Sequence, residues 1–184
     1  GDGKFDLAVA NNSGSTISVW RNTSTAGSLT SSSFASRVDF TAGNGPYGLV
    51  VGDLDGDGKA ELATSNLDGN SVSVLRNTST SGTIASGSFA AKVDFAAGTQ
   101  PRQGALADVN GDGKLDIVAA HCSSCGTISI LRNTGTSATI DSRSFATQVE
   151  FTTGTGPIHV AIGDLDLDGK PDLVVPNYGS GTIS

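Results

Sequence analysis

The chain has 184 residues, a length that accommodates one domain with a sizeable core. It contains 25 glycines, one tryptophan and no methionine, and its runs of serine, threonine, asparagine, valine and alanine favour short strands and tight turns, so we expect an all-β fold. The 18 acidic and 11 basic residues give a net charge of −7, which argues against a nucleic-acid surface, and no apolar run approaches the roughly 18 residues of a membrane helix.

A repeat of 55 or 56 residues organises the sequence. It is marked by aspartates in matching Gly-Asp-Gly-Lys or Leu-Asp-Gly-Lys contexts, which are Asp2, Asp57, Asp112 and Asp168. We expect residues 1–184 to form a single repeat segment. Its repeats cover approximately residues 1–47, 48–102, 103–158 and 159–184, the first truncated at its start and the last at its end.

Each repeat is expected to contain four short strands. In the second repeat, the apolar run 48–52 and the segment 60–65 predict two buried strands. Residues 71–75 alternate with a period of two and predict a half-exposed strand, and a Ser/Thr/Gly-rich loop separates them from a weaker fourth strand at 89–95. We therefore predict four-stranded antiparallel β-propeller blades, about three of them plus a partial one, as a fragment of a larger propeller.

Between the first two strands of each repeat lies a loop with acidic residues at alternate positions. In residues 53–61 they occupy positions 1, 3, 5 and 9, and Gly58 at position 6 permits a sharp turn. Calcium takes about six to eight hard oxygen ligands, which such a loop supplies together with the backbone carbonyl at position 7. The predicted side-chain ligands are Asp53, Asp55, Asp57 and Glu61, then Asp108, Asn110, Asp112 and Asp116, then Asp164, Asp166, Asp168 and Asp172. The predicted backbone ligands are the carbonyl oxygens of Lys59, Lys114 and Lys170.

These loops predict three complete calcium sites and a truncated fourth one at Asp2 and Asp6. Most of the acidic residues of the chain lie in them, and without a cation the clustered carboxylates would repel one another strongly. The alternative is a set of Asp-Gly hairpin turns without metal. An EF-hand is excluded, because position 12 carries no acidic ligand and strand-like residues follow each loop.

The acidic loops, together with the pattern Phe-x-x-Gly-x-x-Pro at residues 40–46, 95–101 and 151–157, resemble the FG-GAP/VCBS repeat. This repeat forms the blades of integrin α-chain propellers and of many bacterial surface proteins. The resemblance implies that calcium stiffens the hairpin between the first two strands of a blade. It also implies a non-enzymatic, secreted or cell-surface module for adhesion or for protein or glycan binding.

Two other functions stay open: a structural subunit of an extracellular filament or sheath, and a propeller domain appended to a secreted enzyme. In each case we expect the rest of a longer polypeptide, or identical chains, to complete the propeller.

The two cysteines, Cys122 and Cys125, lie in the segment that holds the one extra residue of the longer repeat. We predict a small disulfide across this enlarged turn, with a free thiol pair and a metal site including His121 as alternatives. His159 has no partners in the sequence that indicate catalysis, and we expect it to be structural.

Overall fold

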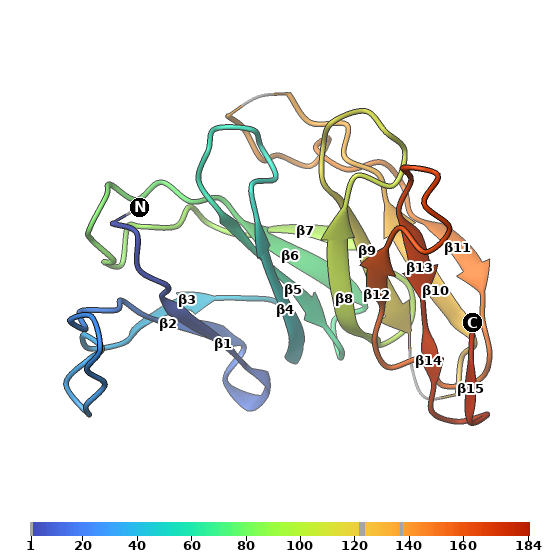
Figure 1. The fold of residues 1–184 in the computed structure, drawn as a ribbon, viewed down its shortest axis with the longest axis horizontal. Helices are drawn as coiled ribbons and strands as arrows, with labels where there is room; N and C mark the ends of the chain where they lie inside the picture. The colour runs from blue at the N-terminus through green and yellow to red at the C-terminus, as the bar shows by residue number, and fades with distance from the viewer. Residues whose placement is uncertain (1, 122–123, 137) are drawn as a thin grey trace.

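The computed structural model describes residues 2–121, 124–136 and 138–184, and these form a row of antiparallel sheets (Figure 1). The only helical element in this part of the chain is a 3-10 turn at Asn12–Gly14. No described helix is long and apolar enough to cross a membrane. The prediction of an all-β fold is confirmed.

Two sheets have four strands each, in sequence order and antiparallel throughout. One consists of β4 (Pro46–Gly52), β5 (Glu61–Asn66), β6 (Ser71–Leu75) and β7 (Val93–Ala96). The other consists of β8 (Pro101–Ala107), β9 (Asp116–His121), β10 (Thr127–Leu131) and β11 (Val149–Thr152). This order and pairing are those predicted for propeller blades.

Smaller sheets stand at the two ends of the row. The first contains β1 (Leu7–Asn11), β2 (Thr16–Trp20) and β3 (Val38–Thr41). At the other end β12 (Ala161–Gly163) pairs with β13 (Asp172–Val174), and β14 (Pro176–Asn177) pairs with β15 (Thr182–Ile183). The sheets form an open arc and do not close into a ring (Figure 1).

The burial of two strands differs from the prediction. β4 was expected to be buried, but Val51 is 55% exposed, because its side chain lines an open cavity between the first and second sheets. β6 was expected to be half-exposed, yet four of its five residues are buried. On its polar face Ser73 is buried, and its hydroxyl forms hydrogen bonds with Asn66 of β5 and Asp94 of β7.

The fourth strand is shorter than predicted. β7 begins only at Val93, and Phe89 forms an isolated bridge with Asn77. The ring of Phe89 packs edge-on against Phe40 of the first sheet, with ring centroids 4.9 Å apart. The segment before β7 therefore contributes mainly to packing between sheets and less to strand pairing.

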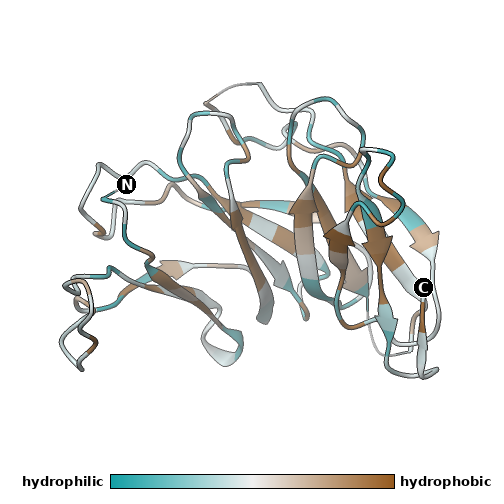
Figure 2. Ribbon diagram, in the orientation of Figure 1, coloured by the Kyte–Doolittle hydropathy of each residue, from teal (hydrophilic) through white to brown (hydrophobic). Residues whose placement is uncertain are grey.

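Hydrophobic clusters lie between neighbouring sheets, and Figure 2 shows hydrophobic residues concentrated in the strands. Between the second and third sheets, Phe95 packs against Phe145 with the same 4.9 Å centroid distance as the pair before it. Leu54, from the loop after β4, joins this cluster and is only 3% exposed. The repeated phenylalanines thus join the first sheet to the second and the second to the third.

A polar network crosses each of the first two sheets at the edge opposite the acidic loops. Asn66, at the end of β5, donates a hydrogen bond to the hydroxyl of Ser73 (2.8 Å), which donates to Asp94 (2.6 Å). Gly43 of the linker pattern lies so close to Asn66 that a Cβ atom would collide with its amide. In the third sheet His121 takes the place of this asparagine and is 1% exposed.

Candidate metal-binding loops

Three acidic loops lie along one edge of the row of sheets, the upper edge in Figure 1. They cover residues 53–60 between β4 and β5, 108–115 between β8 and β9, and 164–171 between β12 and β13. Each loop joins two paired antiparallel strands, so its ends are held close together by the sheet. The loops are therefore hairpin connections, as the sequence predicted.

The aspartates of the first loop organise its backbone. The carboxylate of Asp53 accepts hydrogen bonds from the amides of Gly56 (2.7 Å) and Gly58 (2.9 Å). Asp55 and Asp57 each accept one from the amide two residues further on, at 3.0 and 2.9 Å. Gly58 has a φ angle of +84°, a conformation that side chains with a Cβ atom rarely adopt. The turn thereby directs several carboxylates to one place.

Two of the loops bring three carboxylates together. One oxygen from each of Asp53, Asp55 and Asp57 lies within 4.8 Å of the others. The same limit holds for Asp164, Asp166 and Asp172 in the third loop. Groups of anionic, hard oxygen atoms at such separations suit Ca²⁺, so the residues present fit this ion.

The second loop has the same backbone design with less charge. Asp108 accepts hydrogen bonds from the amides of Gly113 (2.7 Å), Gly111 (2.8 Å) and Asp112 (3.0 Å). These hydrogen bonds hold the pKa of Asp108 below its usual range, and the bond from Gly113 has the largest effect. At position 3, Asn110 supplies a neutral oxygen, and its amide group donates to Asp112 at 3.2 Å.

The carboxylate at position 9 ties the loop to the end of the third strand. Glu61 is fully buried, and its two oxygens accept hydrogen bonds from the amides of Leu54 (2.7 Å) and Asn77 (3.3 Å). Burial raises the pKa of Glu61, although these two hydrogen bonds oppose the shift. Asp116 is held in the same manner, and burial raises its pKa as well. Each carboxylate oxygen keeps a further lone pair, so Glu61 and Asp116 can accept these hydrogen bonds and still bind a metal ion.

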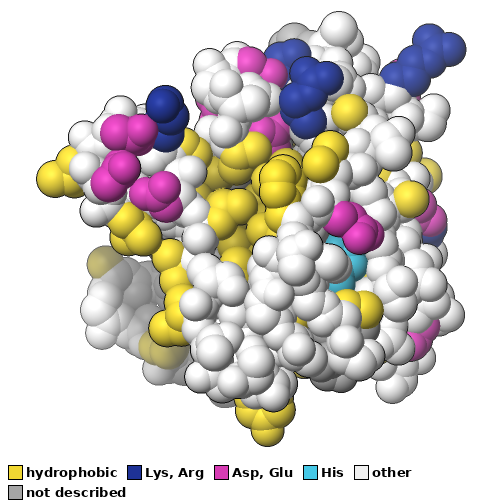
Figure 3. Space-filling view, turned by 90° about the vertical axis from the view of Figure 1, so that its right-hand side faces the viewer, with side chains coloured by type: hydrophobic (Ala, Val, Ile, Leu, Met, Phe, Trp, Pro, Cys, Tyr) yellow, Lys and Arg dark blue, Asp and Glu magenta, His cyan; other side chains and the backbone are white. Residues whose placement is uncertain are grey.

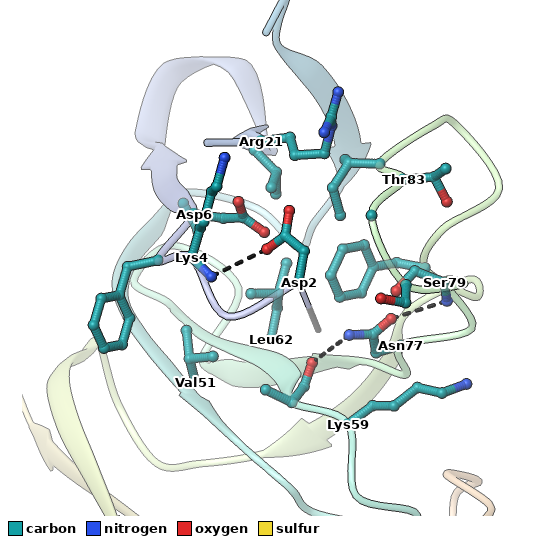
Figure 4. A pocket seen from close by; sticks show the side chains of 18 of the residues that line it. Asp2, Lys4, Asp6, Arg21, Val51, Lys59, Leu62, Asn77, Ser79 and Thr83 are labelled. Atoms are coloured by element: carbon teal, nitrogen blue, oxygen red, sulfur yellow. Dashed lines mark hydrogen bonds between the residues drawn. The ribbon is translucent and has the colours of Figure 1, made fainter. Parts of the chain in front are cut away.

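Asp2 and Asp6, the predicted truncated site, bond to backbone amides. Asp2 accepts from Lys4 (3.1 Å) and Asp6 from Asn22 (2.7 Å). Both line a cavity of about 680 Å³ between the first and second sheets, whose walls include Leu62 (Figure 4). The corresponding space between the second and third sheets holds the Leu54 cluster and a smaller cavity of about 210 Å³.

Sequence reasoning missed the residues that follow the third strand. Asn133 is 2% exposed, and its side-chain amide donates to the carbonyl oxygens of Leu54 (2.8 Å) and Leu115 (3.1 Å). Arg76 reaches into the first loop and forms ion pairs with Asp55 and Asp57. The signal that identifies such residues was available, because an Arg-Asn-Thr tripeptide recurs at the repeat period, at residues 21–23, 76–78 and 132–134.

The predicted cysteine pair is only partly within the described residues. Cys125 is disulfide-bonded, and Cys122 lies outside the described residues. His121 lies at the end of β9 and His159 is exposed.

The chain matches a known protein family. The sequence model of a family described as an FG-GAP-like repeat matches three overlapping segments, residues 1–64, 61–119 and 108–175. No curated protein matches the chain. The first matched segment contains the loop at 53–60, the second contains the loop at 108–115, and the third contains the loops at 108–115 and 164–171.

Proposed function

Because the chain belongs to the FG-GAP-like repeat family, we propose that it is a calcium-binding extracellular module that acts in adhesion or in protein or glycan binding. In this proposal calcium has a structural role and the chain performs no catalysis. The single observation that carries it is the group formed by Asp53, Asp55 and Asp57, whose oxygens converge within 4.8 Å in a loop pattern that recurs along the chain.

The ligands in this proposal are those predicted from the sequence at positions 1, 3, 5, 7 and 9 of the three loops. A bound divalent cation supplies the positive charge that offsets the repulsion among the carboxylates. The residues of the chain do the remaining work. Asp53 and Asp108 accept several backbone amides and thereby shape their loops before any ion binds. Glu61 and Asp116 anchor the loops to the strands.

An extracellular setting is supported by the exposure of the third loop. Asp164 and Asp166 are exposed and Asp172 is partly exposed, so water competes for a cation in the third loop. Extracellular calcium modules have dissociation constants of roughly 10⁻⁴ to 10⁻³ M, a range that suits such open sites.

Further blades, in the same polypeptide or in identical chains, are proposed to pack against the last sheets. Phe151 is 48% exposed, whereas Phe40 and Phe95 at the same repeat position are 6% and 7% exposed. The latter two are covered by a ring from the following sheet. The side of the molecule formed by the last strands presents hydrophobic side chains to solvent (Figure 3).

Thermal unfolding tests the calcium proposal. We expect the melting temperature of the chain to fall in EGTA and to recover on addition of excess calcium, because each site filled at about 100 times its dissociation constant stabilises the fold by about 2.7 kcal/mol. Magnesium at the same concentration controls for ionic strength. The variant Asp94→Asn, changed outside the loops, should keep the full calcium response. A melting temperature that does not depend on calcium would refute the proposal.

A further inference from the structure

The guanidinium group of Arg76 occupies part of the first acidic loop. Its Nε atom lies 2.5 Å from Oδ2 of Asp55 and its Nη2 atom 3.1 Å from Oδ2 of Asp57. The side chain of Asp55 is fully buried in this contact and that of Asp57 is 13% exposed. The Oδ1 atoms of both aspartates already accept backbone amides, so Arg76 takes the remaining oxygen of each carboxylate.

The second loop provides an internal comparison. Arg132 stands at the same repeat position as Arg76, but it is exposed and forms no ion pair with any described residue. The reason lies at position 3, where Asn110 replaces the aspartate that binds Nε of Arg76. The amide group of Asn110 donates to Oδ2 of Asp112 at 3.2 Å, which is the oxygen that corresponds to the partner of Arg76.

The third loop gives its position-5 aspartate yet another partner. Oδ2 of Asp168 lies 3.3 Å from the ammonium group of Lys170, a side chain that is 81% exposed. The three loops thus pair the same oxygen with a half-buried guanidinium, a neutral amide and an exposed ammonium group. Breaking the ion pair of an exposed lysine costs little free energy, whereas separating an arginine from a buried carboxylate costs much more.

We propose that Arg76 is an internal counter-cation of the loop at residues 53–61, and that a divalent cation binds there only by displacing it. This inference rests on the proposed calcium function. Arg76 holds one oxygen of each of two carboxylates that would bind the divalent cation, and the two positive charges repel each other at such short range, so they exclude one another. The first loop therefore has a lower calcium affinity than the third loop and stays charge-compensated when calcium is scarce.

Site-resolved calcium titration tests this inference on the chain of residues 1–184. The position-6 glycine amides of the three loops, Gly58, Gly113 and Gly169, make equivalent hydrogen bonds to the aspartate at position 1, at 2.9, 2.7 and 2.9 Å. Their ¹H–¹⁵N resonances therefore report the three loops separately. In the unaltered chain, the Gly58 resonance should respond at a higher calcium concentration than that of Gly169.

Arg76→Gln removes the guanidinium charge, and Arg132→Gln is the matched control at the same repeat position. Arg76→Gln should lower the calcium midpoint of Gly58 by about tenfold or more, because a competing cation is lost. The midpoints of Gly113 and Gly169 should not move, and Arg132→Gln should leave Gly58 unchanged. A Gly58 midpoint that stays constant or rises in Arg76→Gln would overturn the inference while leaving the calcium function intact. If no glycine amide responds to millimolar calcium in the unaltered chain, the proposed function itself fails, and the inference with it.

A second measurement needs no substitution and so does not depend on the folding of a variant. The Nε–H resonance of Arg76 should change with the same calcium midpoint as Gly58, because its hydrogen bond to Asp55 breaks. The resonance of Arg132 should not change. An Arg76 resonance that stays constant while Gly58 saturates contradicts displacement.

Discussion

Truncation of Leu54 to alanine tests how the metal-loop segments hold neighbouring sheets together. Leu54 is 3% exposed and belongs to the cluster between the second and third sheets, which includes Ile117 and Phe145. Leu165 occupies the same loop position in the last repeat but is 68% exposed. The two residues share chemistry and local sequence, so Leu54→Ala and Leu165→Ala differ only in what surrounds the side chain.

The expected loss of stability follows from this burial. Leu54→Ala removes three carbon groups, worth about 2.4 kcal/mol at about 0.8 kcal/mol each, and the cavity left behind adds about 1 kcal/mol. We therefore expect a decrease of about 3 to 4 kcal/mol in the free energy of unfolding. Leu165→Ala should change it by less than about 0.5 kcal/mol, because the exposed side chain loses few contacts.

Urea unfolding followed by the fluorescence of Trp20 and by circular dichroism measures both variants under calcium-saturated and calcium-free conditions. A domain of this size should also show a melting temperature about 6 to 16 °C lower for Leu54→Ala. Equal losses for the two variants would show that the packing between sheets does not carry the stability argued for it.

Two further substitutions test local features. Leu167 has a φ angle of +65° where the corresponding Gly111 has +78°, so Leu167→Gly should raise the free energy of unfolding by about 0.5 to 1 kcal/mol, after the greater freedom of glycine in the unfolded chain is subtracted. Leu165 has no positive φ angle, so Leu165→Gly should lower the free energy of unfolding. A loss in both variants would contradict backbone strain at Leu167. Burial lowers the pKa of His121, so the folded state favours the neutral ring. Its contribution to the free energy of unfolding is therefore fully present above the ordinary pKa of about 6.5, and it is lost as the pH falls toward and through the lower pKa of the folded state. His121→Asn should remove this loss when melting temperatures are compared from about pH 7 to about pH 5, whereas His159→Asn should not; parallel curves for the unaltered chain and His121→Asn would contradict the assignment.

The repeat period, the strands and the acidic loops were predictable from the sequence because they depend on neighbours a few residues apart. Alternate aspartates with a glycine at position 6 define a turn wherever they occur, and the structure shows Gly58 in the left-handed conformation that this turn requires. The convergence of Asp53, Asp55 and Asp57 follows from the same local winding. Their spacing along the chain was therefore a reliable guide to their grouping in space.

The burial of β6 and the pairing of Arg76 depend on contacts between segments that lie apart in the sequence, and the pattern of the acidic loops does not predict these contacts. The alternation in β6 predicts a half-exposed strand, but Ser73 is fully buried, and its hydroxyl bonds to Asn66 and Asp94 across the sheet. The Arg-Asn-Thr tripeptide is visible as a repeat, yet nothing in it reveals that Arg76 pairs with Asp55 while Arg132 stays free of ion pairs with the described residues.

The amino-acid sequence by itself determined that this protein is built of β-sheet repeats with hairpin loops suited to a divalent cation, because strand periodicity and turn chemistry are local. Only the tertiary structure decided which equivalent residues differ in role. Leu54 is buried and Leu165 is exposed because a neighbouring sheet covers the first and not the second. The pairing of Arg76 likewise requires the end of β6 to lie beside the first acidic loop, a proximity that arises when the chain folds.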